Sequence, residues 1–293
     1  MMFTTQTFGK WILSGEHAVI RGYPALVFPL GNYPLNFSFE THDTSLLIES
    51  QALMAPVIEK VWYRAWEACE MPTPKGVIKC QSCIPIGQGM GASAALCLAI
   101  ARCVCHITHR LEYIFELAKK LEHDFHHQSS GLDIIGAGSL SGSVFEKGQA
   151  QPIPIQWHPY WRLTPTFTTG STTEAVNQVM QLFDENLQKA EKIDSQMNKS
   201  VRLCLGALKS PQDITNLILG MKIAHDCFKD WGLITPNMQA HIQKLYARGA
   251  LAVKPTGSGG GGYLLSLWQN NQIPSEQGEI PIILPIDKKS HPL

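Results

Sequence analysis

Residues 85–93 read PIGQGMGAS, and an almost uninterrupted apolar stretch follows them directly. Three glycines at alternate positions disfavour regular structure and allow a ligand to approach the backbone closely. The stretch from Ala94 to Ile107 contains one charged residue, Arg102, so we expect a helix buried on all sides. A glycine loop that opens such a helix brings backbone N–H groups and the positive end of the helix dipole to one point. The loop therefore predicts a phosphate-binding site, and a tight turn without a ligand is the alternative.

Ser93 ends this loop at the expected start of the helix. The loop is not a Walker A sequence, because no Lys-Ser or Lys-Thr closes it, and it lacks the spacing of a dinucleotide-binding loop. Serine is favoured as a helix N-cap, and its hydroxyl can also bind a magnesium ion that accompanies phosphates. The sequence leaves both roles open for Ser93.

Two acidic residues follow the buried helix. The segment from Leu111 to Phe125 repeats apolar residues at helical spacing, and Glu122 falls on this apolar stripe. A buried ionised carboxylate needs a cation, a metal or hydrogen-bond donors, so Glu122 is either a salt-bridged structural residue or a magnesium ligand. Asp133 lies in the loop SSGLD, where it either caps a turn or projects into a cleft.

Lys10 is the one charged residue of the apolar segment 8–14, which we expect to form a strand. A lysine in such a segment either faces water from an edge strand or pairs with an acid. Lys10 and Asp133 together indicate an acid–base pair.

The other patterns predict a chain that mixes strands and helices. Alternating residues indicate a half-buried antiparallel sheet in the N-terminal part, and helical spacing dominates the C-terminal part. We expect strands at 24–28, 35–39, 45–49, 76–84 and 280–286, and helices at 53–70, 111–125 and across most of 173–231.

A second glycine-rich loop, KPTGSGGGGY at 254–263, lies between a short expected strand and an apolar one. Four consecutive glycines destabilise a fold unless the backbone must pass close to another group. The proline-containing segment 150–159 is the expected domain junction, or else a loop beside a strand.

Length and composition restrict the class of protein. A chain of 293 residues with 44% hydrophobic and 16% charged residues is an ordinary globular protein, long enough for two domains with a cleft between them. Lys plus Arg equals Asp plus Glu at 24 each, which gives no reason to expect a nucleic-acid partner or a membrane surface. No apolar stretch reaches the roughly 20 residues that span a bilayer. Eight scattered cysteines and the lack of a signal-peptide pattern lead us to expect reduced thiols and a cytoplasmic location.

Three segments, taken in chain order, resemble the signature motifs of the GHMP kinases, which include galactokinase, homoserine kinase, mevalonate kinase and phosphomevalonate kinase. They are GKWILSGEHAVIRGYPAL at 9–26, PIGQGMGASAAL at 85–96 and KPTGSGGGGY at 254–263. The GEHAV sequence, and GSTTEAV at 170–176, are similar to the mevalonate kinase branch in particular. The resemblance implies an α+β fold with an N-terminal α/β domain at 1–155, a ferredoxin-like C-terminal domain at 156–293 and the active site between them.

The resemblance also implies roles for individual residues. It implies ATP as co-substrate, Mg²⁺ as cofactor and a small acidic acceptor, and it leaves a homodimer open. By position in the motifs, Asp133 and Lys10 would be catalytic; Ser93 and Glu122 would bind Mg²⁺; Pro85, Gly87, Gly89, Gly91, Ala92 and Ser93 would bind ATP; and Glu16, His17, Gly257, Ser258 and Gly259 would bind the acceptor.

Departures from the family pattern bear on the acceptor. The first motif begins FGK where the family has APGK, Ala92 replaces the first of two serines, and the SSGLD loop lacks the usual proline. We expect the phosphorylation of mevalonate to 5-phosphomevalonate in isoprenoid precursor synthesis. Phosphomevalonate or another GHMP acceptor is the alternative, and a catalytically silent ligand-binding regulator on the same fold is the alternative of another class.

Overall fold

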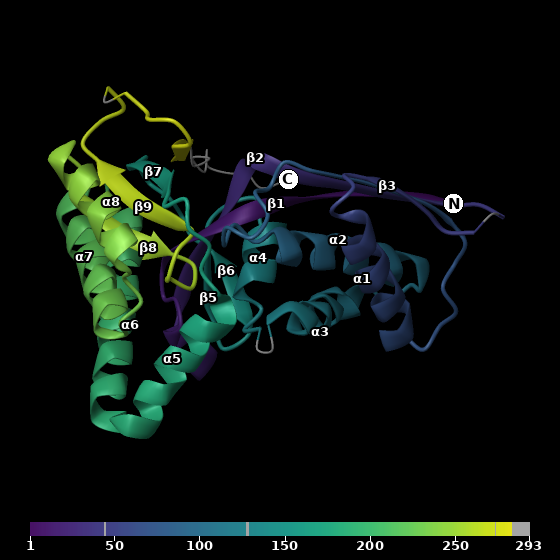
Figure 1. Ribbon diagram of the computed structural model, residues 1–293, viewed down its shortest axis with the longest axis horizontal. Coiled ribbons are helices and arrows are strands. Elements are labelled where there is room, and N and C mark those ends of the chain that lie inside the picture. Colours follow the sequence, from purple (N-terminus) through teal and green to yellow (C-terminus); the bar gives the residue numbers. More distant parts are fainter. Residues whose placement is uncertain (44, 127–128, 273, 283–293) are drawn as a thin grey trace. The chain divides into compact units, whose positions relative to one another are not determined.

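The computed structural model describes residues 1–43, 45–126, 129–272 and 274–282 (Figure 1). These residues form two compact units. Unit 1 comprises 1–10, 29–86 and 90–140, and unit 2 comprises 11–28, 87–89 and the described residues from 141 onward. Strands β1 (Met2–Ser14) and β2 (Ala25–Thr41) therefore contribute residues to both units. The expected domain division at 155/156 stays a prediction.

The sheet of unit 1 contains a long strand where the sequence predicts two short ones. Strand β2 pairs with β1 and runs antiparallel to β4 (Gly76–Ser82), while β3 (Leu47–Ser50) runs parallel to β4. The expected strands at 24–28 and 35–39 are both part of β2. Pro29 and Pro34 lie between the residues that pair with β5 (Ser143–Glu146) and those that pair with β4, so neither must donate a hydrogen bond to these strands. The sheet is mixed, and the expected purely antiparallel arrangement is wrong for β3.

The helices of unit 1 are α1 (Ala55–Ala68), α2 (Ala92–Ile107), α3 (Ile114–His126) and α4 (Leu132–Gly138), and α1, α2 and α3 lie together on one face of the strands (Figure 1). Helix α2 is buried from Ala94 to Cys105 except at Arg102, which confirms the expected buried helix. The helix expected from residue 111 begins with a 3-10 turn, Leu111–Tyr113. Leu111 is 60% exposed, so its predicted place on the apolar stripe is wrong.

Unit 2 is built on a four-stranded antiparallel sheet in the order β10-β7-β9-β8. In this order the strand last in sequence lies beside the first, as in a ferredoxin-like sheet. A short hairpin of β5 and β6 (Gln149–Pro152) pairs with residues 25–27 of β2 and occupies part of the expected junction at 150–159. The sheet strands are β7 (Tyr160–Pro165), β8 (Ala252–Thr256), β9 (Tyr263–Trp268) and β10 (Ile280–Ile282).

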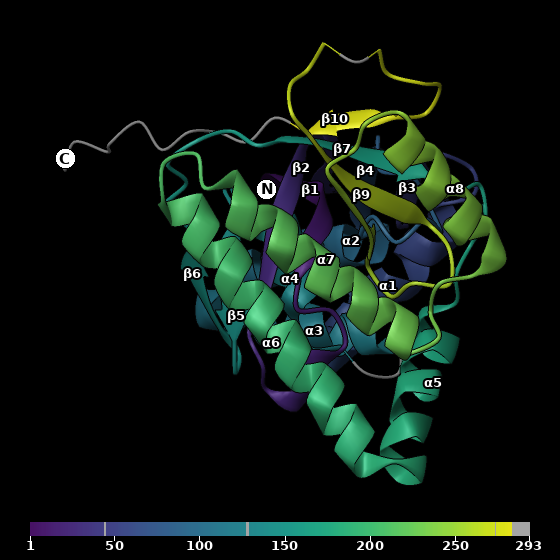
Figure 2. The ribbon, with the colours of Figure 1, turned by 90° about the vertical axis from the view of Figure 1, so that its left-hand side faces the viewer.

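Four helices in the described residues accompany this sheet. Three of them occupy the stretch 173–231 that the pattern predicts to be mostly helical, and the fourth lies beyond it. Helices α6 and α7 run side by side, and α8 lies against β8 and β9 (Figure 2). The second half of the strand expected at 280–286 lies outside the described residues. No helix in the described part of the chain has the length and hydropathy that crossing a bilayer requires. The helices are α5 (Thr172–Glu185), α6 (Leu187–Lys209), α7 (Ile214–Asp230) and α8 (Pro236–Ala247).

Candidate active site

An ion pair joins the buried Lys10 and the partly exposed Asp133 in unit 1. The Nζ of Lys10 lies 2.9 Å from Oδ2 of Asp133, and the two side chains are 3% and 31% exposed. Lys10 therefore does not face water from an edge strand. Gly131 occupies the N-cap position of α4, and Asp133 lies in the first turn of this helix. The expectation that Asp133 caps a helix is therefore wrong. The predicted acid–base partners are in contact, and their catalytic roles stay predictions.

The first glycine loop passes directly over the side chain of Lys10. The backbone N–H of Lys10 donates a hydrogen bond to the carbonyl of Met90, with an N–O distance of 2.9 Å. Gly91 has a φ of +78°, and a Cβ atom at this position would lie 2.7 Å from Cγ of Lys10. Glycine is therefore required at residue 91 both by its left-handed backbone and by the close approach to Lys10.

Gly91, and not Ser93, is the N-cap residue of α2. Ser93 is the second residue of the helix, and no side chain caps the helix. The N-cap alternative for Ser93 is therefore wrong. The first turn of an uncapped helix directs its N–H groups outward, which suits an anion. Gly87 and Gly89 also have left-handed φ values, +71° and +75°, in the exposed part of the loop.

Glu122 on α3 is a buried carboxyl group. It is 2% exposed, and the hydroxyl of Ser129 donates a hydrogen bond to its Oε2. Burial, with the negative charge of Asp133 as a second cause, raises the pKa of Glu122 to about 8, although Ser129 and Lys10 oppose the shift. Among the described residues Glu122 forms no salt bridge, so the salt-bridged alternative does not hold there.

The oxygen donors of unit 1 fit a magnesium ion that is completed by phosphate. Within the described ranges no group of three or more His, Cys, Asp or Glu residues could hold a metal on its own. Mg²⁺, however, is usually bound by one or two carboxylates together with the phosphates of a substrate. Glu122 and Asp133 influence each other electrostatically, and Glu122 forms no salt bridge within the described part of the chain, so the donor chemistry suits this ion.

In unit 2, Glu16 forms a buried ion pair. The Nζ of Lys254 on β8 donates a hydrogen bond to Oε1 of Glu16 at 2.6 Å, and both residues are almost fully buried. Gly15, with a φ of +106°, fixes the chain before Glu16, since a Cβ there would lie 2.4 Å from the Cα of Ala25. Sequence reasoning missed Lys254. The signal was the one that identified Lys10, because Lys254 is likewise a lone lysine in an apolar strand, and it is the first residue of the motif at 254–263.

His17 is a neutral, buried imidazole. Its Nε2 lies 2.9 Å from the carbonyl oxygen of Ser258 and donates a hydrogen bond to it, because a carbonyl can only accept. The ring packs edge to face against Trp231 and Phe228. Burial lowers the pKa of His17 to about 4, so at neutral pH the ring is uncharged and its Nδ1 is a hydrogen-bond acceptor.

The second glycine loop is folded tightly against its neighbours in unit 2. Gly257 and Gly259 have left-handed φ values of +90° and +82°, and a Cβ on Gly259 would press on Leu233 and Phe228. The hydroxyl of Thr256 donates to the carbonyl of Ile12 and accepts from its N–H, both at 2.9 Å. These two hydrogen bonds hold the start of the loop against β1, and Glu16 and His17 follow β1 in sequence.

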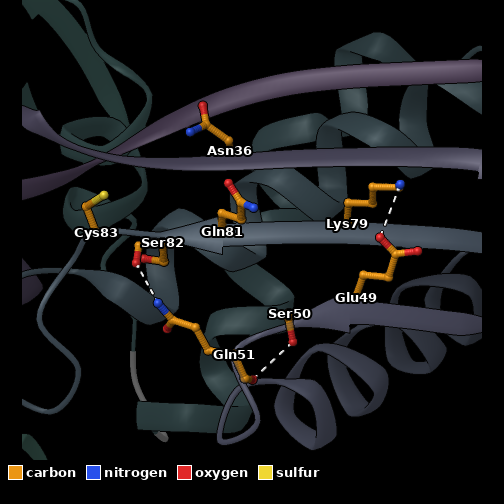
Figure 3. Close-up of a pocket in the computed structure, with 8 residues that line it drawn as sticks. All are labelled: Asn36, Glu49, Ser50, Gln51, Lys79, Gln81, Ser82 and Cys83. Atoms are coloured by element: carbon orange, nitrogen blue, oxygen red, sulfur yellow. Dashed lines mark hydrogen bonds and ion pairs between the residues drawn. The ribbon is translucent and has the colours of Figure 1, made fainter.

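A polar cavity of about 570 Å³ lies on the sheet of unit 1 (Figure 3). Six of its eight lining side chains are exposed, so the cavity is open to solvent. Gln51 reaches the carbonyl of Ser82 at 3.2 Å, and Lys79 lies 3.1 Å from Glu49 across β3 and β4. Cys83 is exposed, whereas Cys80 is buried. The cavity is lined by Asn36, Glu49, Ser50, Gln51, Lys79, Gln81, Ser82 and Cys83.

The predicted site residues divide between the two units. The structure brings Lys10 to Asp133, Glu122 close to both, and His17 to Ser258. Unit 1 carries Lys10, Pro85, Gly91, Ala92, Ser93, Glu122 and Asp133, and unit 2 carries Glu16, His17, Gly87, Gly89, Gly257, Ser258 and Gly259.

Comparison with known proteins identifies the class. Residues 57–140 match the family model described as the GHMP kinases N terminal domain. This match covers the helical part of unit 1, and the relatives described next extend the similarity to kinases of the GHMP superfamily over about 90% of the chain.

Similar proteins of known sequence or structure include mevalonate kinases and a galactokinase. Mevalonate kinase of Pyrococcus horikoshii is 29% identical over 90% of this chain and 88% of its own, and that of Archaeoglobus fulgidus is 28% identical over 90% and 92%. The structure of L. major mevalonate kinase in complex with R-mevalonate matches with a TM-score of 0.77 and 21% identity, over 92% of this chain and 88% of that one. Lactococcus lactis galactokinase complexed with galactose matches with a TM-score of 0.75 and 15% identity, over 91% and 85%.

We predict that Gly91→Ala displaces Lys10, because the new Cβ would lie 2.7 Å from Cγ of a side chain held by Asp133. Gly148→Ala is the matched control, since Gly148 has a similar φ of +81° and nothing within 4 Å of the added Cβ. Both variants should lose about 1–2 kcal/mol from left-handed strain. Chemical denaturation should show a further loss for Gly91→Ala only. Equal destabilisation of the two variants would contradict the packing of Gly91 on Lys10.

We predict that His17 makes the stability fall with acid. An unfolded histidine has a pKa near 6.5 and folded His17 one of about 4, so its contribution is full above pH 6.5 and is lost as the pH falls towards 4. The loss amounts to about 3 kcal/mol. Urea unfolding of His17→Asn, which tolerates the φ of 58°, should lack this part of the pH dependence.

His109→Asn is the control for this experiment, because His109 is exposed and has a similar φ of 56°. It should leave the pH dependence unchanged. If wild type and His17→Asn differ by the same free energy of unfolding at pH 7 and pH 4.5, His17 is not a neutral buried ring.

Proposed function

We propose that this protein transfers the terminal phosphate of ATP to the 5-hydroxyl of mevalonate and so acts as a mevalonate kinase in isoprenoid precursor synthesis. The observation that carries the proposal is the 2.9 Å ion pair between the buried Lys10 and Asp133, beneath a glycine loop that begins a buried helix. The mevalonate kinases among its relatives support the choice of acceptor.

The proposed mechanism assigns proton transfer to Asp133. Its carboxylate accepts the proton of the acceptor hydroxyl as the oxygen attacks the γ-phosphate. Lys10 pairs with Asp133 and stabilises negative charge on the transferring phosphoryl group. Its ammonium is nearly fully buried, and its Coulomb energy is therefore less screened than at the surface.

The glycine loops bind the two substrates in this proposal. Pro85 begins the loop, and the backbone N–H groups of Gly87, Gly89, Gly91, Ala92 and Ser93 hold the phosphates of ATP at the start of α2. Glu122 and Ser93 would hold Mg²⁺, which would offset negative charge on the phosphates of ATP. Glu16 and the Nδ1 acceptor of His17 orient the acceptor, and Gly257, Ser258 and Gly259 contribute backbone donors.

We further propose that the cavity in Figure 3 holds the base and ribose of ATP. Ser82 and Cys83 line it and are followed in sequence, after Ile84, by the phosphate-binding loop. The side-chain amides of Asn36, Gln51 and Gln81 offer both hydrogen-bond donors and acceptors, which a purine base requires.

An observation on Arg21 favours the unphosphorylated acceptor. Phosphomevalonate needs cations for its phosphate, and Arg21 is the arginine next to the Glu16–His17 pair in sequence. Its guanidinium is bound bidentately to the buried Asp194, at 2.5 and 2.6 Å. An arginine committed in this way offers little to a second phosphate. A homodimeric state and a cytoplasmic location stay predictions.

The proposal predicts acceptor-dependent ADP release. A coupled assay with Mg-ATP compares mevalonate, phosphomevalonate, homoserine and galactose at equal concentration. We expect turnover with mevalonate and none above background with the other three. Turnover with phosphomevalonate alone would show that phosphomevalonate, and not mevalonate, is the acceptor. ATP binding without turnover of any acceptor would favour a silent ligand-binding regulator.

The nucleoside cavity predicts protection of one thiol. Cys83 is the exposed cysteine, and the other seven are buried. N-ethylmaleimide should therefore modify the native protein at Cys83 first, and ATP should slow this reaction at least tenfold, while mevalonate alone should not. Cys83→Ser is the control that assigns the signal. Unchanged labelling at saturating ATP would contradict the placement of the nucleoside.

A further inference from the structure

Lys254 is a buried cation that the proposed mechanism does not use. It is 0% exposed, in a strand whose residues are all buried. Its ammonium contacts Oε1 of Glu16 at 2.6 Å, the carbonyl oxygen of Ile12 at 3.4 Å, and the face of Phe228 at 5.4 Å from the ring centroid. A buried ammonium needs such compensation, because its desolvation is costly.

These contacts link Lys254 to Glu16 and His17, the two residues proposed to bind the acceptor. Glu16 is bound by Lys254 directly, and the ring of His17 packs on Phe228, the same ring that faces the ammonium. Glycine loop 257–259 also rests on Phe228 through Gly259. Lys254 therefore acts on the acceptor through its neighbours and is a positioning residue.

The charges around Glu16 cancel. Lys254 pairs with Glu16, Arg21 pairs with Asp194, and His17 is neutral, so these five groups together carry no net charge. Without Lys254 the sum would be −1, next to residues proposed to bind an acceptor that carries a carboxylate. Like charges within a partly desolvated site repel strongly enough to change affinity by a factor of ten or more.

We propose that Lys254 determines the charge preference of the acceptor site: by neutralising Glu16, its ammonium allows an anionic acceptor to bind. This inference rests on the proposed function, because it assumes that Glu16 and His17 bind the acceptor. Its specific consequence is that acceptor preference follows the net charge of the Glu16–Lys254 pair and not the mere presence of either side chain.

The test compares an anionic acceptor with a neutral one. The acceptors are mevalonate and its primary amide, which keeps both hydroxyls but lacks the negative charge. For each variant the measured quantity is the ratio of kcat/KM for mevalonate to kcat/KM for the amide. Loss of a hydrogen bond common to both acceptors cancels in this ratio, so a purely structural role for Lys254 leaves it unchanged.

Four proteins differ in the net charge of the Glu16–Lys254 pair. This charge is +1 in Glu16→Gln, zero in the wild type and in the double variant Glu16→Gln/Lys254→Met, and −1 in Lys254→Met. We expect the ratio to rise in Glu16→Gln, to fall at least tenfold in Lys254→Met, and to return towards wild type in the double variant. The KM for ATP should stay within twofold. Lys254→Arg, which keeps the charge, should retain the wild-type ratio.

Two results would overturn the inference: a ratio that is the same in all variants, or a shift in the same direction in Glu16→Gln and Lys254→Met. If Lys254→Met fails to fold because Glu16 is left buried without a counter-charge, Glu16→Gln and the neutral double variant still decide the question. Wild-type turnover of mevalonate is measured first. Its absence would overturn the proposed function, whereas an unordered ratio in an active enzyme would overturn only the role of Lys254.

Discussion

The buried ammonium of Lys10 is the constraint on which the rest of unit 1 depends. An ammonium that is 3% exposed cannot be left without a counter-charge, and Asp133 supplies one at 2.9 Å. Asp133 lies in the first turn of α4. Gly91 leaves room for the side chain of Lys10, and the carbonyl of Met90 accepts a hydrogen bond from the backbone N–H of Lys10. The glycine loop, the start of α2 and Asp133 are thereby held around one cation.

Unit 2 repeats the same physical solution with a different purpose. Lys254 is also a lone cation in an apolar strand, and Glu16 is its counter-charge at 2.6 Å. In the proposed function, Lys10 is in contact with the residue that handles the proton, whereas Lys254 lies behind the residues that hold the acceptor. A buried lysine paired with a carboxylate is weak evidence for stability, since an apolar pair can be as stable. The two pairs are more readily explained by the chemistry of an anionic substrate and a transferred phosphate.

The sequence was informative where a residue type conflicted with its surroundings. Lys10 and Glu122 are charges in apolar patterns, and the structure buries both of them. The pattern of α2 predicted a buried helix because it lacks a polar face. Other features were beyond sequence reasoning because they depend on tertiary contacts. Strand β2 continues through two prolines because it pairs with β5 on one side of them and with β4 on the other. Gly91 is the N-cap of α2, where a side chain would collide with Lys10. The role of Lys254 depends on its contact with Glu16, which lies far away in the sequence.

The central claim, that Lys10 and Asp133 act as one unit in phosphoryl transfer, is tested most directly by single-turnover kinetics. Lys10→Met, Asp133→Asn and the double variant are mixed with Mg-ATP and mevalonate, and product is measured by rapid quench. The account predicts that each single variant slows the transfer step by a factor of hundreds, as expected when one electrostatic group is lost. It also predicts that the double variant is no slower than the slower single variant, because groups that act together are not additive. Near wild-type transfer in Asp133→Asn, or fully additive losses in the double variant, would contradict it.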